Sequence, residues 1–188
     1  MGTGGDKLGA TTTTGDLEWL GDSAAIGPWS LDPAGSRAEF HVKHFWGAIT
    51  VHGSIGGITG GGTIGADGVV TGQVRMGAAS LSTKNKRRDE HLRSADFFSV
   101  KEHPEVVVTV TKAQPSGPGT LACQGTLEAA GHSQPIDFIA QVEAYGAQAV
   151  TLRAQLMIDR THLAMTWSPL GVAARMVRAT AVVRFVHS

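Results

Sequence analysis

The sequence predicts an all-β protein, an eight-stranded antiparallel barrel with a short helical segment after the third strand. Three observations indicate this fold. Polar and apolar residues alternate along many short stretches, turn-forming residues separate these stretches, and glycine is unusually frequent. The 25 glycines are about twice the average share of about 7%, and they fall mostly at strand ends and bends. Closed barrels need such bends.

The eight strands are expected at residues 37–43, 47–58, 68–79, 105–112, 120–129, 135–143, 149–158 and 176–186. The first shows the alternation clearly, since Ala38, Phe40 and Val42 fall on one face and polar residues on the other. The glycine-rich run at 56–62 is expected to be a loop or a bent, bulged segment.

One barrel domain is expected at 28–188, preceded by a flexible tail at 1–27. The tail could dock on the barrel through Leu17, Trp19 and Leu20, and an unstructured tail is an equal alternative. It lacks the basic start and long apolar run of a secretory signal, so we expect a cytoplasmic protein. No stretch reaches the roughly 18 apolar residues that a transmembrane helix requires.

Charge and side-chain chemistry exclude several classes of function. The net charge is zero, which argues against a nucleic-acid binder and against electrostatic docking to anionic membranes. The single cysteine, Cys123, allows no intrachain disulfide and is expected to be a small buried residue. The eight histidines include no pair two residues apart, the spacing that a metal site on a strand favours, so no metal is expected.

The expected strands are rich in Ala, Gly and Val, and the chain has only 6 Phe, 4 Trp and 1 Tyr. Small side chains would leave an eight-stranded barrel partly empty, and empty apolar volume costs on the order of 24 cal/mol per Å³. Either the barrel is flattened or it holds a long apolar guest. Strands of this length span about 30 Å, which would suit an extended lipid chain.

The segment 81–106 stands apart from the strands, because 11 of its 26 residues are charged and it shows no alternation. Asn85 is expected to cap a short helix in which Asp89 and Arg93 pair on one face. The apolar residues expected to face or anchor the barrel are Leu92, Ala95, Phe97 and Phe98. The segment is therefore interpreted as a strap over one end or side of the barrel.

The run N-K-R-R-D-E-H-L-R-S-A-D-F-F at 85–98, followed by His-Pro, resembles the signature of the YceI-like family of polyisoprenoid-binding proteins. Segments 29–44 and 158–167 resemble two further motifs of that family, and the resemblance covers roughly 28–187. It implies a lipocalin-like, extended barrel that holds an isoprenoid or other long lipid chain in an internal tunnel. It implies no catalysis, no cofactor besides the bound lipid, and a possible homodimer. Members of the family are often periplasmic or secreted.

Several residues depart from the family pattern. Gly35 stands where histidine is usual, and Ser82 and Ser99 stand where aspartate is usual. Leu163 and Ala164 replace a common pair of an aromatic residue and glycine. These departures touch the turns and polar positions of the motifs, whereas the strand pattern is kept.

The resemblance implies a lipid tail inside the barrel and a polar head near residues 84–93, where a cluster of lysines and arginines could attract an anionic group. The residues expected to contact the ligand are Phe40, Val42, Phe45, Trp46, Arg88, Asp89, His91, Leu92, Phe97, Phe98, Met157, Met165 and Trp167. Arg88, Asp89 and His91 are also compatible with a network that only fixes the helix. Two other functions stay open: an enzyme that acts on a lipid-like substrate through His91 and Asp89, and a stress-linked structural barrel.

Overall fold

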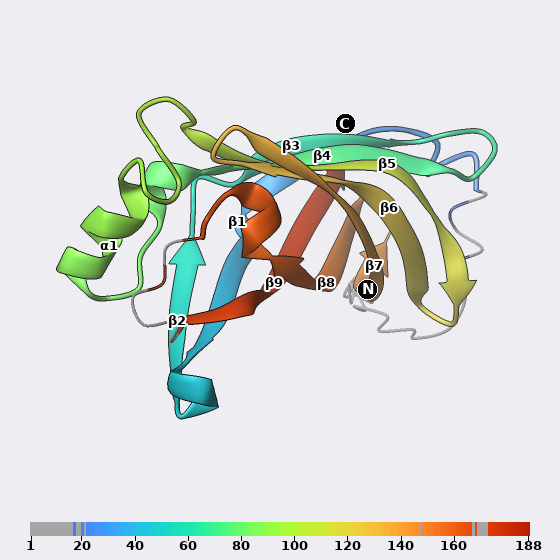
Figure 1. Cartoon of the computed structure of the whole chain (residues 1–188). Coiled ribbons are helices and arrows are strands. Elements are labelled where there is room, and N and C mark those ends of the chain that lie inside the picture. Colours follow the sequence, from blue (N-terminus) through green and yellow to red (C-terminus); the bar gives the residue numbers. More distant parts are fainter. Residues whose placement is uncertain (1–16, 18–19, 21, 147, 167, 169–172) are drawn as a thin grey trace, which may run out of the picture.

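The computed structural model of the protein describes residues 17, 20, 22–146, 148–166, 168 and 173–188. Across these residues nine strands form one antiparallel sheet that curls into a barrel (Figure 1). The strands are β1 (Gly27–His44), β2 (Ile49–Ile55), β3 (Thr59–Ile64), β4 (Val70–Gly77), β5 (Glu105–Gly117), β6 (Thr120–Ala129), β7 (His132–Gly146), β8 (Ala149–Asp159) and β9 (Ala173–His187). The helical elements are α1 (Lys86–Arg93) and the 3-10 turns η2 (Phe45–Gly47), η3 (Ala78–Ser80) and η4 (Arg160–Leu163).

The barrel closes because β1 pairs with β9 along most of its length, from Trp29 opposite His187 to His44 opposite Ala173. A strand has two edges, and two other strands share the second edge of β1. Its first residues pair with β3 and its last residues pair with β2. The closed ring therefore contains eight strands, β1 and β3 to β9, which confirms the predicted eight-stranded antiparallel barrel. β2 is a ninth strand that extends one side of β1.

The strand β3 corrects the prediction for the glycine-rich run. Only residues 56–58 form a connection, and 59–64 pair with both β1 and β4. Glycine is needed here because neighbouring backbones lie very close: a Cβ on Gly61 would lie 2.8 Å from the Trp29 carbonyl oxygen. A Cβ on Gly72 would lie equally close, 2.8 Å, to the Gly61 carbonyl oxygen. The helix α1 consequently follows the fourth strand and not the third.

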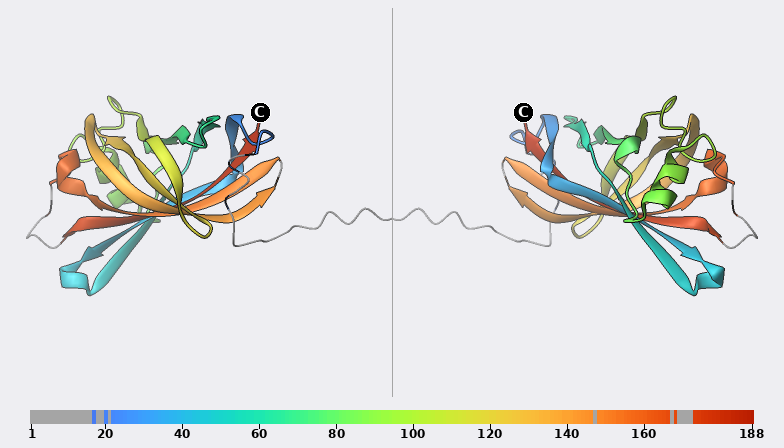
Figure 2. Two further views of the ribbon diagram at one scale, coloured as in Figure 1. Left: turned by 90° about the vertical axis from the view of Figure 1, so that its right-hand side faces the viewer. Right: turned by 90° about the vertical axis from the view of Figure 1, so that its left-hand side faces the viewer.

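The paired ends of β1 and β2 project from the barrel as a hairpin, with η2 at its tip (Figure 2). Two large apolar side chains are exposed there, Phe45 at 48% and Ile49 at 51% of full exposure. The strand pattern places Ile49 on the same face as Val51, which lines the barrel interior. Ile49 is nevertheless exposed, since the hairpin has left the barrel at that point.

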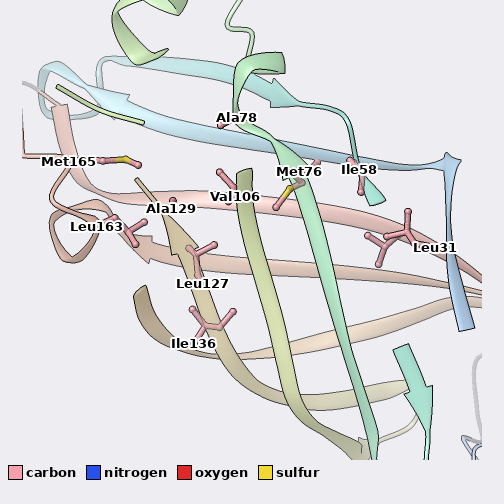
Figure 3. Packing of buried hydrophobic residues seen from close by; sticks show 12 residues of the cluster. Leu31, Ile58, Met76, Ala78, Val106, Leu127, Ala129, Ile136, Leu163 and Met165 are labelled. Carbon is pink, nitrogen blue, oxygen red and sulfur yellow. The ribbon is translucent and has the colours of Figure 1, made fainter. Parts of the chain in front are cut away.

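Buried residues form two clusters inside the barrel. One contains Met76, Leu127, Ile136, Leu163 and Met165 with their neighbours (Figure 3). The other contains Leu20, Trp29, Ile64, Leu121 and Val150 with their neighbours. Leu17 packs against the second cluster and Leu20 belongs to it, so these two residues contact the barrel as the sequence predicted. Trp19, the third residue of the predicted contact, lies outside the described residues, as does 1–16.

Candidate ligand-binding cavity

The interior of the barrel holds two adjoining cavities. Chamber 1 has a volume of about 160 Å³ and chamber 2 of about 300 Å³. Their walls share five residues, named here the waist: Ala38, Met76, Val108, Leu156 and Ala181. The two chambers therefore adjoin at the waist, and together they make up an elongated apolar interior, named here the tunnel.

The length of the tunnel can be estimated along strand β8, because the inward residues of β8 line both chambers. Val150 lines chamber 1 and Ile158, eight residues further on, lines chamber 2. At about 3.3 Å per residue these two positions lie about 26 Å apart. A cavity of this length and modest volume fits an extended chain better than a compact molecule.

The tunnel exists because many inward residues are small. Those lining chamber 1 include Gly61, Gly62, Gly72, Ala113, Ala140 and Ala154. Cys123 also lines chamber 1 and is buried, as the sequence predicted. Burial raises the pKa of its thiol to about 11, so the sulfur stays protonated near neutral pH and is a poor nucleophile.

Helix α1 belongs to the strap predicted at 81–106 and lies at one end of the barrel (Figure 1). Hydrogen bonds from residues of the helix and its cap hold it in place. The Asn85 side chain accepts from the backbone N–H of Arg88, which confirms the predicted cap. Asp89 accepts from the backbone N–H of Thr83 at 2.8 Å and from the Thr83 hydroxyl at 2.5 Å. Arg93 donates to the backbone carbonyl of Leu81. Asp89 and Arg93 were predicted to pair with each other, and each instead bonds to a different residue of the segment before the helix.

The carboxyl group of Asp89 is buried at 6% exposure and serves this anchor. Burial acts to raise its pKa, but the hydrogen bonds from Thr83 and Ser82 outweigh burial and lower the pKa below the ordinary value. Asp89 is therefore ionised near neutral pH. It does not line either chamber, and its role is to fasten the helix to residues 82–83.

The apolar residues after the helix close chamber 2. Leu92, Phe97 and Phe98 line it, as expected from the sequence. Ala95 was predicted to face the barrel and is instead exposed. The helix ends at Arg93, so helical spacing no longer determines where residue 95 points.

Five ionisable side chains line chamber 2: Glu39, His44, Arg88, His91 and Arg160. Arg88 donates from Nε to the Thr83 hydroxyl at 2.7 Å and from Nη2 to the Thr83 carbonyl at 3.0 Å. Arg160 donates to the main-chain carbonyls of residues 165, 173 and 174. The pKa of His44 is lowered, first by burial and then by the positive charges of Arg88 and Arg160. The wall of chamber 2 is therefore apolar apart from Thr180 and these five side chains, among which the two arginines carry positive charge.

Of the residues predicted to contact a ligand, eight line chamber 2: Phe40, Val42, Arg88, His91, Leu92, Phe97, Phe98 and Met165. Phe45 lies exposed at the hairpin tip. Met157 is 53% exposed because it alternates with the inward residues Leu156 and Ile158. The side chain of Trp46 and the whole of Trp167 lie outside the described parts of the chain.

Sequence reasoning missed Arg160 and all of chamber 1. Arg160 belongs to the motif at 158–167, so its place in that motif was the available signal. Chamber 1 is lined by Trp29, Phe138, Phe185 and many small residues from different strands. Alternation marks each of these as inward, but only the closed ring brings them together.

The described residues contain no group of three or more His, Cys, Asp or Glu side chains that could hold a metal ion. His91 lies 3.3 Å from Asp96 through its Nε2, while Asp89 is bonded to Thr83. The acid and base of the predicted enzyme alternative therefore have different partners. None of the helices that the structure describes is long and apolar enough to cross a membrane.

A closed eight-stranded barrel around an elongated apolar tunnel defines a ligand-binding barrel of the lipocalin type in its architecture. The YceI-like domain matches residues 29–186, which is most of the chain. The protein belongs to the YceI-like family.

Two relatives illustrate the sequence similarity. A UPF0312 protein of Yersinia enterocolitica is 27% identical over 138 residues, which are 71% of this chain and 71% of the relative. A UPF0312 protein of Pectobacterium carotovorum is 30% identical over 131 residues, which are 66% of each chain.

Two solved structures share the fold. BcnA of Burkholderia cenocepacia superposes with a TM-score of 0.73 at 17% identity, over 82% of this chain and 98% of BcnA. A polyisoprenoid binding domain from Saccharophagus degradans, implicated in plant cell wall breakdown, superposes with a TM-score of 0.71 at 18% identity. That match covers 87% of this chain and 99% of the domain. The barrel described above is therefore the barrel of this family.

Proposed function

We propose that the protein binds one long-chain, isoprenoid-type lipid inside the barrel and sequesters or carries it without changing it chemically. The observation that carries the proposal is the elongated apolar tunnel of two adjoining chambers, with about 26 Å between Val150 and Ile158. Apolar burial is worth about 25 cal/mol per Å², so a long tail along this wall would supply most of the affinity. The similar fold of the polyisoprenoid binding domain from Saccharophagus degradans supports the ligand class.

The polar head of the lipid would lie in chamber 2 beside Arg88 and Arg160, because their guanidinium groups can compensate an anionic or strongly polar head. Arg88 uses Nε and Nη2 to hold Thr83, which keeps its guanidinium oriented while the ligand is absent. The tail would then run past the waist toward chamber 1.

The enzyme alternative would need His91 and Asp89 to work as a pair. Asp89 is buried against Thr83, and His91 contacts Asp96 and stacks edge-on against Phe97. This arrangement favours a strap over a catalytic centre, which supports binding without turnover. A homodimer and a cytoplasmic location remain predictions that light scattering and cell fractionation can check.

The experiment is organic extraction of the purified protein followed by mass spectrometry, together with titration of the delipidated protein with geranylgeraniol. We expect a long-chain lipid in the extract and saturable binding of the alcohol at one site. An absence of both would overturn the proposal and favour a structural barrel. Conversion of the alcohol during the titration would favour an enzyme.

A matched pair of variants separates binding in the tunnel from adhesion to the surface. Ala181→Phe adds an aromatic ring at the waist, and it should lower binding at least tenfold while filling the cavity and preserving the fold. Gln155→Phe adds the same ring at an exposed position of β8 and should bind as the unmodified protein does. Equal loss in both variants would argue against the tunnel.

A further inference from the structure

The wall of chamber 1 includes a residue that precedes the part of the chain matched by the YceI-like domain. That match begins at residue 29, whereas Leu20 lines chamber 1 and is only 3% exposed. Leu20 packs in one cluster with Ala25, Trp29, Ile64 and Val150. The segment before the family domain therefore contributes a wall of the cavity.

Residues 22–25, which precede β1, are held by hydrogen bonds. The backbone N–H of Ala25 donates to the carbonyl of Asp22 at 2.9 Å, and the Asp22 carboxylate accepts from the backbone N–H of Ala24 at 3.1 Å. The indole Nε1 of Trp29 donates to the carbonyl of Ala25 at 2.9 Å. The Trp29 ring meets the His187 ring edge-on, with centroids 4.9 Å apart. The bond from Trp29 to Ala25 ties the segment to β1, and the ring contact of Trp29 with His187 joins β1 to β9.

The two ends of the tunnel differ in chemistry. Chamber 2 contains the positively charged groups of Arg88 and Arg160, whereas chamber 1 is lined almost wholly by apolar residues and glycine and has Leu20 in its wall. An amphiphile held with its head in chamber 2 must place the end of its tail in chamber 1. The length of tail that can be buried then depends on how far the chain runs beyond the waist before it meets Leu20.

We propose that Leu20 is an end stop that sets the longest ligand chain the protein accepts. This inference rests on the proposed function and adds a specificity-determining residue to it. A chain longer than the tunnel must expel the Leu20 side chain from its cluster, which exposes apolar surface, or leave its own end in water. Either outcome removes the gain from further chain length, so affinity should rise with length up to a limit and then stop rising.

The test uses the delipidated full chain and a series of isoprenoid alcohols, from geraniol through farnesol and geranylgeraniol to solanesol. The alcohols are offered together, and the bound fraction of each is measured by mass spectrometry of the extracted complex. We expect a cut-off in the unmodified protein. Leu20→Ala should move the cut-off to longer alcohols, with at least a tenfold gain for the first excluded one and little change for the shorter ones.

Two further variants guard against a simple loss of folding. Ala154→Phe fills chamber 1 without touching chamber 2 and should move the cut-off to shorter alcohols. Met157→Ala, at an exposed position of the same strand, should leave the profile unchanged. An unchanged cut-off in folded Leu20→Ala, or a protein that binds all lengths equally, overturns the end stop alone. Failure of the unmodified protein to bind any of the alcohols overturns the proposed function as well.

Discussion

Phe40 of β1 lies over Gly53 of β2 so closely that a Cβ on Gly53 would lie 2.1 Å from the nearest ring carbon. The two residues are direct partners in the antiparallel register. Phe40 also lines chamber 2, so the ring covers a glycine on one strand while it forms a wall of the cavity. The absence of a side chain at residue 53 therefore determines where this wall lies.

Replacing Gly53 with Ala should displace the Phe40 ring, since a methyl group cannot share its space. We expect the free energy of unfolding to fall by about 1–3 kcal/mol, the usual cost of overpacking, and lipid affinity to fall several-fold. Urea denaturation and ligand titration measure the two effects. Gly146→Ala is the matched control, because a Cβ there meets no atom within 4 Å. Similar losses in both variants would contradict this account.

Replacing Asp89 with Ala should loosen the strap, because the buried N–H of Thr83 loses its acceptor. An unsatisfied buried donor costs about 1–3 kcal/mol, and urea denaturation should show a loss of that size. The lowered pKa of Asp89 adds a pH signature. Its contribution is complete above the ordinary carboxyl pKa of about 3.9 and is lost as the pH falls further toward the folded value, so the variant should be less sensitive to acid in that range.

The exposed residue Glu90 of the same helix provides the control for Asp89. Glu90→Ala should change stability by less than about 0.5 kcal/mol, as is usual for exposed positions away from special features. If Asp89→Ala is as stable as Glu90→Ala, the hydrogen bonds to Thr83 do not fasten the helix.

Replacing Ala164 with Gly should stabilise the protein. Ala164 ends η4 in the left-handed conformation, at φ 56°, and the common family residue at this position is glycine. A residue with a Cβ loses roughly 1–2 kcal/mol of stability in the left-handed region, and glycine avoids this loss. The greater freedom of glycine in the unfolded chain offsets part of the gain. Thermal unfolding should show a small rise in Tm.

Ala48 is the matched control for Ala164, since it also follows a 3-10 turn but has a right-handed conformation at φ −67°. Ala48→Gly should lower stability by about 0.5–1 kcal/mol, because glycine only adds freedom to the unfolded chain there. A rise in Tm for both variants, or for neither, would remove the conformational explanation.

The lowered pKa of His44 predicts that the protein loses stability in mild acid. The unfolded chain takes up a proton at about pH 6.5, whereas the folded histidine resists protonation beside Arg88 and Arg160. Unfolding therefore becomes easier as the pH falls below about 6.5, and the loss ends once the pH is below the folded pKa. Replacing His44 with Gln should flatten this part of the stability profile, measured by urea denaturation at several pH values. A profile with the same slope in both proteins would rule out His44 as its source.

Local sequence patterns were sufficient for most of the barrel. Alternation places Ala38, Phe40 and Val42 on the inward face of one strand, and the structure finds all three on the cavity wall. The Asn85 cap follows from residue chemistry alone, because a short polar side chain before a helix satisfies a free N–H in any fold. The same patterns left β3 unrecognised, since glycines carry no side chains whose alternation could reveal a strand.

Gly35, which stands where the family usually has histidine, shows that a comparison of motifs does not reveal the spatial neighbours of a residue. A Cβ at this position would lie 2.6 Å from Cδ of Arg184, and Arg184 forms an ion pair with Asp32 at 2.6 Å. The glycine makes room for a side chain that comes from β9, almost the whole length of the chain away. Nothing near residue 35 in the sequence indicates that neighbour.

The sequence by itself determined the all-β class, seven strands of the ring with their inward faces, the helix cap and the family, because each depends on spacing within a short stretch. Only the tertiary structure decided the tunnel: its two chambers, the waist, the place of Arg160, and the place of Leu20 in the wall of chamber 1. These arise where side chains from distant strands meet. The register of the closed ring sets those meetings, and alternation along one strand carries no information about which residues lie opposite it.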